Sequence, residues 1–113
     1  MGLYFSHGNA RWSYSGFNSF RERLAKIAGF DLREMRGFNG HKRWDKIKDP
    51  IKDLLNHSDC DDELTPEQCR VIAPRLTEMI KYWDDDDYDK QEASELIRGM
   101  EEAISKNESL VFE

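Results

Sequence analysis

The spacing of apolar residues along the chain predicts three long amphipathic helices. The first follows Ser15 as its N-cap and stops at Gly29, with an apolar stripe of Phe17, Phe20, Leu24, Ile27 and Ala28. The second lies behind Thr65, and its stripe comprises Cys69, Ile72, Ala73, Leu76, Met79, Ile80 and Trp83. The third covers roughly residues 89–106, and its stripe comprises Ala93, Leu96, Ile97, Met100, Ala103 and Ile104. Each helix therefore has one face to bury against the others.

Two signals bear on how the second of these helices begins and continues. Thr65, Pro66 and Gln68 form a capping-box sequence with proline in the first turn, which is a strong start signal. Pro74 lies inside the stripe and removes the hydrogen bond to the carbonyl of Arg70. We therefore expect a kink at Pro74 or a break into two helices.

Shorter elements fill the rest of the chain. Asp31 caps one turn of helix over residues 31–37, and Asp49, followed by proline, begins a short helix over residues 49–57. The glycine-rich stretch between these two elements, residues 37–46, is predicted to be a loop.

The two ends of the chain are rich in β-forming residues. Residues 2–6 and 109–113 each predict a short strand, and pairing between them would close the domain. The predicted fold class is mainly α, a compact bundle of about four to five helices with a short two-stranded β element from the chain termini. Residues 1–113 are predicted to form a single domain, because no linker or internal repeat divides them.

Composition bears on whether the protein is folded and whether it is expected in a membrane or outside the cell. Thirteen aromatic residues among 113 argue against disorder, although 35% of the residues are charged. No apolar run approaches the ~20 residues that a membrane-spanning helix needs. The first residues also lack the charged and then apolar layout of a signal peptide. We therefore expect a cytoplasmic protein with no membrane partner.

Charge is distributed unevenly between the two halves. Residues 1–53 carry a net charge of +5 and residues 54–113 carry −11, which together give the overall −6. Such a division suggests two faces of opposite potential. The acidic half would repel a long phosphate backbone, so extended nucleic acid is not an expected partner.

The stretch HSDCDDELTPEQC, residues 57–69, crowds acidic side chains around His57 and two cysteines. A calcium loop of the EF-hand type that begins at Asp59 would have Leu64 at its required glycine position. The same loop would have Arg70 at its bidentate glutamate position, so a standard EF-hand is excluded. A non-standard cation site is left open, because clustered carboxylates attract hard cations.

Three other chemistries of this stretch are less favoured than a simple turn. A zinc site would combine His57, Cys60 and Cys69, but paired ligands at short spacing are missing and Cys69 belongs to an apolar stripe. A disulfide between the cysteines is not expected in a reducing compartment. A nucleophilic cysteine is opposed by the surrounding negative charge, which raises the pKa of a thiol. We therefore predict a structural turn before the helix that Thr65 caps, with no metal, no cofactor and no enzymatic activity.

Two blocks of the sequence carry a resemblance. WSYSGFNSFRERLA (12–25) and LLNHSDCDDELTPEQC (54–69) resemble a group of small uncharacterised bacterial and phage-associated proteins, whose members often have glycine at the position of Asp62. The resemblance implies a shared fold. It implies no activity, because that group has no established function to transfer.

A candidate ligand site lies in the N-terminal half, where aromatic rings alternate with cationic side chains. Rings can stack on planar ligands, and arginine forks bind phosphate in a bidentate manner. The sequence thus predicts a non-enzymatic binding domain for a small anionic or nucleotide-like ligand. The residues proposed to hold it are Trp12, Tyr14, Arg21, Arg36, His41, Arg43 and Trp44. The opposing interpretation is that the rings belong to the core and that the arginines pair with the acidic half.

The alternative function is a protein-interaction role for the acidic C-terminal half. An inhibitor or adaptor of the immunity type would dock a basic partner surface on this half. The resemblance to phage-associated proteins would place such a role in phage–host conflict. Its binding residues would be the consecutive aspartates Asp84, Asp85, Asp86 and Asp87. Such a charged run is also typical of a solvated loop between helices.

Overall fold

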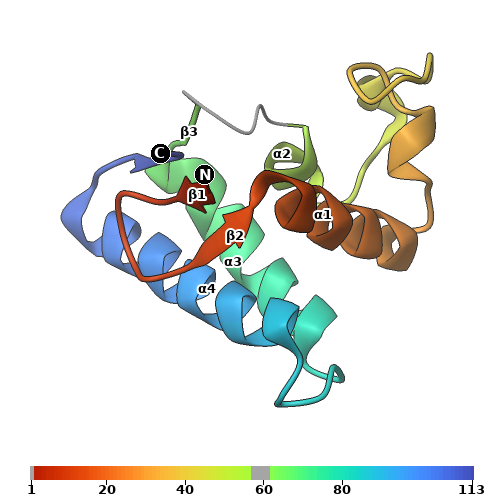
Figure 1. Cartoon of the computed structure of the whole chain (residues 1–113). Coiled ribbons are helices and arrows are strands. Elements are labelled where there is room, and N and C mark those ends of the chain that lie inside the picture. The colour runs from red at the N-terminus through yellow and green to blue at the C-terminus, as the bar shows by residue number, and fades with distance from the viewer. Residues whose placement is uncertain (1, 57–61) are drawn as a thin grey trace.

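The structure, a computed structural model of the chain, describes residues 2–56 and 62–113 and is mainly α-helical (Figure 1). Its α-helices are α1 (Tyr14–Ala28), α2 (Lys52–Leu55), α3 (Pro66–Ile80) and α4 (Tyr88–Lys106). Two short 3-10 turns are η1 (Leu32–Glu34) and η2 (Trp44–Lys46). The strands are β1 (Gly2–Tyr4), β2 (Arg11–Ser13), β3 (Glu63–Leu64) and β4 (Leu110–Val111). The predicted mainly α fold is thus confirmed.

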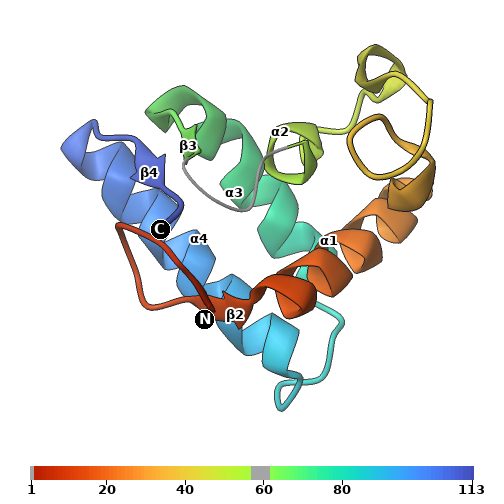
Figure 2. The same ribbon diagram turned by 45° about the horizontal axis from the view of Figure 1, so that its top comes forward.

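Helices α3 and α4 lie side by side and form the largest helical contact of the molecule (Figures 1 and 2). The predicted capping box begins α3, since the Thr65 hydroxyl accepts from the Gln68 amide at 3.2 Å and the Gln68 side chain accepts from the Thr65 amide at 2.8 Å. The helix does not break at Pro74 but continues to its end at Ile80. Pro74 and Arg70 are both exposed, so water can satisfy the carbonyl that loses its partner.

Helix α1 begins earlier than its sequence predicted. Its N-cap is Ser13 rather than Ser15, and the Ser13 hydroxyl accepts from the Gly16 amide at 3.0 Å. The predicted stop is confirmed, because Gly29 has the left-handed φ of 96° that ends helices. Ile27, which was expected in the apolar stripe, is 45% exposed.

Both ends of the chain form short strands, but their main partners differ from the predicted ones. β1 pairs with β2, and β4 pairs with β3, both antiparallel. The two termini also pair with each other at an antiparallel bridge between Phe5 and Phe112. There the Ser6 amide donates to the Val111 carbonyl at 2.9 Å, and the Glu113 amide donates to the Tyr4 carbonyl at 2.7 Å. The predicted contact between the termini is thus present as a bridge, while each terminal strand has its longer pairing with another segment.

An aromatic cluster connects these strands to α1. The Trp12 ring of β2 stacks on Phe20 of α1, with centroids 4.7 Å apart and planes 18° apart. Phe5 meets the Trp12 ring edge-on and Phe17 meets it tilted. Phe112 packs edge-on against both Phe5 and Phe17. All five side chains are at most 7% exposed, so burial of aromatic surface fixes how α1 meets the two chain ends.

The short helix predicted over residues 49–57 is reduced to one turn, α2. Asp49 accepts a hydrogen bond from the Ile51 amide at 3.0 Å, so it caps the turn that precedes α2. Its carboxylate also pairs with Arg75 of α3 at 2.8 Å, and this lowers the pKa of Asp49. Residue 57, the predicted end of the helix, lies outside the described residues.

The hydropathy of the helices bears on the expectation of no membrane partner. Within residues 2–56 and 62–113, no helix combines the length and the apolar character needed to cross a bilayer. The longest helix, α4, instead alternates buried and charged exposed positions.

Candidate functional site

A loop over residues 36–48, named here the basic loop, projects beyond the C-terminal end of α1 (Figures 1 and 2). It follows η1 and contains η2, and its conformation is fixed by main-chain hydrogen bonds. The Arg36 amide donates to the Lys42 carbonyl at 2.9 Å, and the Lys42 amide donates to the Glu34 carbonyl at 2.9 Å. The Gly40 amide donates to the Met35 carbonyl at 3.2 Å. The base of the loop is therefore closed across Met35 and Lys42.

Two positions in the loop need particular backbone freedom. Asn39 has a φ of 73°, in the left-handed region that asparagine tolerates better than most residues. Gly40 lies so close to η1 that a Cβ atom would stand 2.0 Å from the Glu34 carbonyl carbon. The Asn-Gly pair, which the sequence marked as a loop, therefore allows the chain to return against η1.

The aromatic side chains of the basic loop face the protein. The Trp44 ring is 9% exposed and meets Phe30 and Phe38 edge-on, with centroids 5.9 Å and 6.0 Å away. Its indole N–H donates to the Arg36 carbonyl at 2.9 Å, so it also holds the start of the loop. Trp44 is thus the anchor of the loop.

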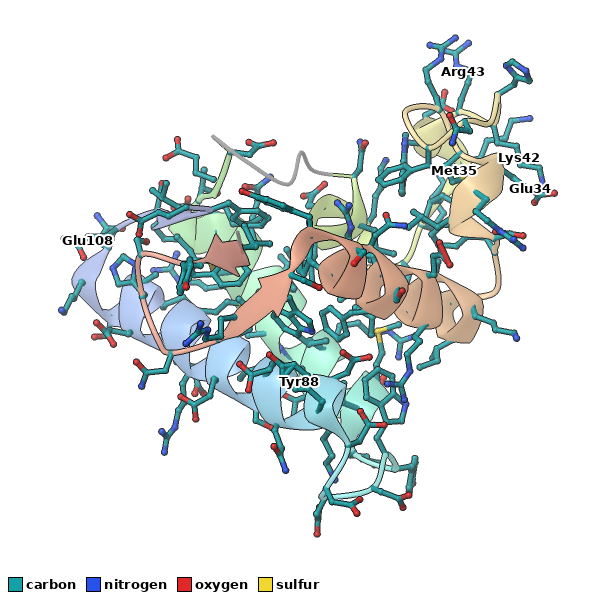
Figure 3. All side chains as sticks on the ribbon, in the orientation of Figure 1. Glu34, Met35, Lys42, Arg43, Tyr88 and Glu108 are labelled. Carbon is teal, nitrogen blue, oxygen red and sulfur yellow. The ribbon has the colours of Figure 1, made fainter. Side chains whose placement is uncertain are left out.

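The cationic side chains of the loop face outward, and Figure 3 shows Arg43 at its tip. The loop has five lysines and arginines against a single aspartate, a net charge of +4. Its exposed cationic or imidazole side chains are Arg36, His41, Lys42, Arg43, Lys46 and Lys48.

Few of these charges are neutralised locally. Lys42 pairs with Glu34 at 2.9 Å, and Arg43 approaches Asp45 at only 3.7 Å with its side chain 70% exposed. Among the described residues, the side chains of Arg36, His41 and Lys46 make no hydrogen bond or ion pair. The loop therefore presents cations that are free to meet an external anion.

The seven residues predicted to hold a ligand fall into separate places. Arg36, His41, Arg43 and Trp44 all belong to the basic loop, with Trp44 turned inward. Trp12 is 3% exposed in the aromatic cluster at the other end of α1. Its indole N–H donates to Asp89 of α4 at 3.0 Å, while the neighbouring Tyr14 is exposed.

Arg21, the remaining predicted residue, lies on α1 between these two places. Its side chain is 2% exposed and its guanidinium lies between two rings, 4.9 Å from the Phe17 centroid and 5.0 Å from the Phe38 centroid. It also donates to the Asn18 side chain at 3.3 Å. Arg21 therefore connects α1 to the basic loop as part of the interior. Within the described residues the Trp12 and Trp44 rings have no common aromatic neighbour, so each belongs to its own cluster.

A hollow of about 590 Å³ lies between α1 and the base of the basic loop. Three cations and three carboxylates line it together with Phe30: Lys26, Arg33, Lys42, Glu22, Asp31 and Glu34. Four of these side chains are paired, Arg33 with Asp31 at 3.2 Å and Lys42 with Glu34 at 2.9 Å. The hollow therefore carries no excess charge, and the excess lies on the outer face of the loop.

The acidic connector, residues 84–87 between α3 and α4, is partly scaffold. Asp87 caps α4 by accepting from the amides of residues 89 and 90. Arg23 of α1 reaches both Asp87, at 3.0 Å, and Asp89, at 2.7 Å. Its guanidinium lies 3.7 Å from the Trp83 ring centroid. These contacts lower the pKa of Asp87, chiefly through the hydrogen bond from Arg23.

The other aspartates of the connector differ in their contacts. Asp85 pairs with Lys90 at 2.9 Å, which lowers the pKa of Asp85. Asp84 and Asp86 are exposed, and in the described part of the chain their side chains have no ion-pair partner. Of the four predicted partner-binding residues, the structure therefore commits two to internal pairs.

The structure describes only part of the acidic stretch of residues 57–69, for which the sequence predicts a turn. Residues 57–61, which include His57, Asp59 and Cys60, lie outside the described residues. Downstream, the Asp62 carbonyl accepts from the Phe112 amide at 2.8 Å, and Cys69 is fully buried. Burial raises the pKa of the Cys69 thiol to about 11, so this thiol is protonated at neutral pH. Outside residues 57–61 and Met1, no group of three or more potential metal ligands is found.

Sequence reasoning overlooked two kinds of residue. Lys42, Lys46 and Lys48 extend the cationic surface, and their density between residues 36 and 48 was a signal that could have included them. Arg23 gave no such signal, because its partners lie 64 and 66 positions away.

No known protein family, curated protein or solved structure matches the chain.

Proposed function

We propose that the protein is a non-enzymatic binding domain that holds an anionic ligand on the outer face of the basic loop. The observation that carries the proposal is a loop of net charge +4, closed at its base by main-chain hydrogen bonds, whose exposed Arg36, His41 and Lys46 have no partner among the described residues. A loop on a helical scaffold is a common place for binding residues, because the scaffold fixes it and solvent reaches it.

Arginine gives this surface its chemical preference. Arg36 and Arg43 present guanidinium groups, which bind carboxylates and phosphates in a bidentate manner. The main-chain hydrogen bonds at Met35 and Lys42 order the loop in advance, so binding need not order it again.

The acidic remainder of the molecule does not cancel this attraction. The protein extends over 36 × 30 × 29 Å, whereas exposed charges are screened beyond ~8 Å at physiological ionic strength. A short anion that touches only the basic loop is therefore affected mainly by the loop itself.

Amide chemical shifts of the isotope-labelled protein, titrated with pyrophosphate and with citrate, test this function. We expect amide signals within residues 36–48 to shift with either anion, while those of α4 stay in place. The variant Arg36→Gln/Arg43→Gln/Lys46→Gln should lose these shifts. A matched control is Arg70→Gln/Lys81→Gln/Arg98→Gln, which removes the same charge from exposed positions on and beside α3 and α4. Shifts that are absent, or that are equal in the loop variant and the wild type, contradict the proposal.

The alternative is docking of a basic protein partner on the acidic half. Asp84 and Asp86 support it, because they are exposed and have no ion-pair partner among the described residues. Asp85 is also exposed but pairs with Lys90, and Asp87 pairs with Arg23. The variant Asp84→Asn/Asp86→Asn, titrated with a lysine-rich peptide, tests this alternative. Unchanged affinity relative to the wild type would exclude docking at the connector.

A further inference from the structure

We infer that the anion recognised by the basic loop belongs to an acidic segment of another protein, an extended stretch rich in aspartate and glutamate. The inference rests on the proposed function and names the partner class of the same surface. It follows from what the loop exposes, what it hides, and what surrounds it.

The loop exposes much charge and little aromatic surface. Trp44 is 9% exposed, and both Phe38 of the loop and the neighbouring Phe30 are partly buried against it. Proteins that bind nucleotides or single strands at open surfaces use exposed rings on which bases stack. Because the two rings of this loop pack inward as anchors, charge is the main feature that the loop offers to a ligand.

The neighbouring surface is unsuitable for duplex nucleic acid. Outside the basic loop, the chain carries a net charge of −10. A duplex is a rod with about one negative charge per 1.7 Å, so across a molecule this small it would face acidic surface as well as the loop. A flexible acidic peptide can instead contact the loop alone and avoid the acidic surface around it.

The shape of the site favours a protein segment over a small molecule. The cations lie on a projecting loop, as Figures 1 and 3 show, whereas small ligands are usually enclosed in a concave site. The hollow beside the loop is concave, but its lysines and arginines are matched by an equal number of carboxylates. An acidic segment laid over the outer face can contact several loop cations at once.

Fluorescence anisotropy of a short labelled polyglutamate peptide tests the inference, with labelled duplex DNA and labelled polylysine as comparison probes. We expect polyglutamate to bind the wild type more tightly than duplex DNA does, with affinity that falls as salt is raised. Polylysine should not bind at the loop. The variant Arg36→Gln/Arg43→Gln/Lys46→Gln should bind polyglutamate at least about tenfold more weakly, since each exposed pair contributes a few-fold.

The matched control, Arg70→Gln/Lys81→Gln/Arg98→Gln, has the same net charge and should bind polyglutamate like the wild type. Equal weakening in both variants would show a general electrostatic effect and overturn the inference. Tighter binding of duplex DNA than of polyglutamate would also overturn it. If pyrophosphate and citrate shift the loop amides but polyglutamate does not bind, the partner class is wrong and the anion-binding function stands. If no anion binds, both fail.

Discussion

Two charged loops, the basic loop and the acidic connector of residues 84–87, use their charges in opposite ways. In the connector, Asp87 caps α4 and pairs with Arg23, while Asp85 pairs with Lys90. In the basic loop, the main chain and Trp44 hold the structure, and most cations stay exposed. The density of charge in a loop therefore does not tell whether its charged side chains support the fold or remain at the surface. The outcome depends on whether a side chain of opposite charge or a helix end lies close enough to pair with each charged residue.

The strongest test of this contrast removes the anchor of the basic loop. Trp44→Ala should destabilise the protein by about 3 kcal/mol or more, as truncation of a buried tryptophan does. Urea unfolding measures the loss. Trp44→Phe keeps a ring but loses the hydrogen bond to the Arg36 carbonyl, so its effect should be smaller. A loss below about 1 kcal/mol for the alanine variant would mean that the main chain alone holds the loop.

The next effect comes from the acidic connector. Asp87→Ala removes both the cap of α4 and the partner of Arg23, and a lost cap alone costs about 1 kcal/mol. Asp84→Ala and Asp86→Ala should each change the free energy of unfolding by less than about 0.5 kcal/mol, because neither side chain has an ion-pair partner within residues 2–56 and 62–113. Equal effects of the three substitutions in urea unfolding would contradict a scaffold role for Asp87.

Lowering the pH should also reveal that Asp87 stabilises the fold. Arg23 lowers the pKa of Asp87 in the folded protein below its usual 3.8, so the unfolded chain binds this proton more readily. The resulting stability is present above the usual pKa and is lost as the pH falls through the lowered one. Asp87→Asn keeps a capping side chain without the charge, so its stability should fall less than that of the wild type between pH 5 and pH 3. Parallel urea midpoints for both proteins over that range would rule out this contribution.

The smallest effect is expected for the outward charges of the basic loop. Arg36→Gln, Arg43→Gln and Lys46→Gln should each alter the free energy of unfolding by less than about 0.5 kcal/mol. In the described part of the chain, Arg43 has only a distant partner, and Arg36 and Lys46 have none. Thermal unfolding followed by circular dichroism measures the change. A large loss of stability in any of the three variants would mean that the substituted charge supports the fold, as Asp87 does in the connector.

The sequence determined the elements whose signals are local. Helical spacing and the capping box of Thr65 and Gln68 depend on neighbours within a few positions, and both reappear in α3. Gly29 ended α1 for the same reason. The segment 37–46 was recognised as a loop because glycine and Asn39-Gly40 interrupt the helical pattern, although the turn η2 within it was not foreseen.

Only the tertiary structure decided the partners of each segment and the direction of each side chain. The terminal strands were foreseen, but β1 and β4 each found a different partner, because pairing depends on segments that the fold brings near. By sequence, Trp12 and Trp44 fit either a ligand site or the core, and Arg21 fits either a ligand site or an ion pair with the acidic half. Packing among Phe17, Phe38 and their neighbours placed all three inside. The chemistry of a side chain limits which contacts it can make. Which of these contacts form depends on the segments that the fold brings close to it.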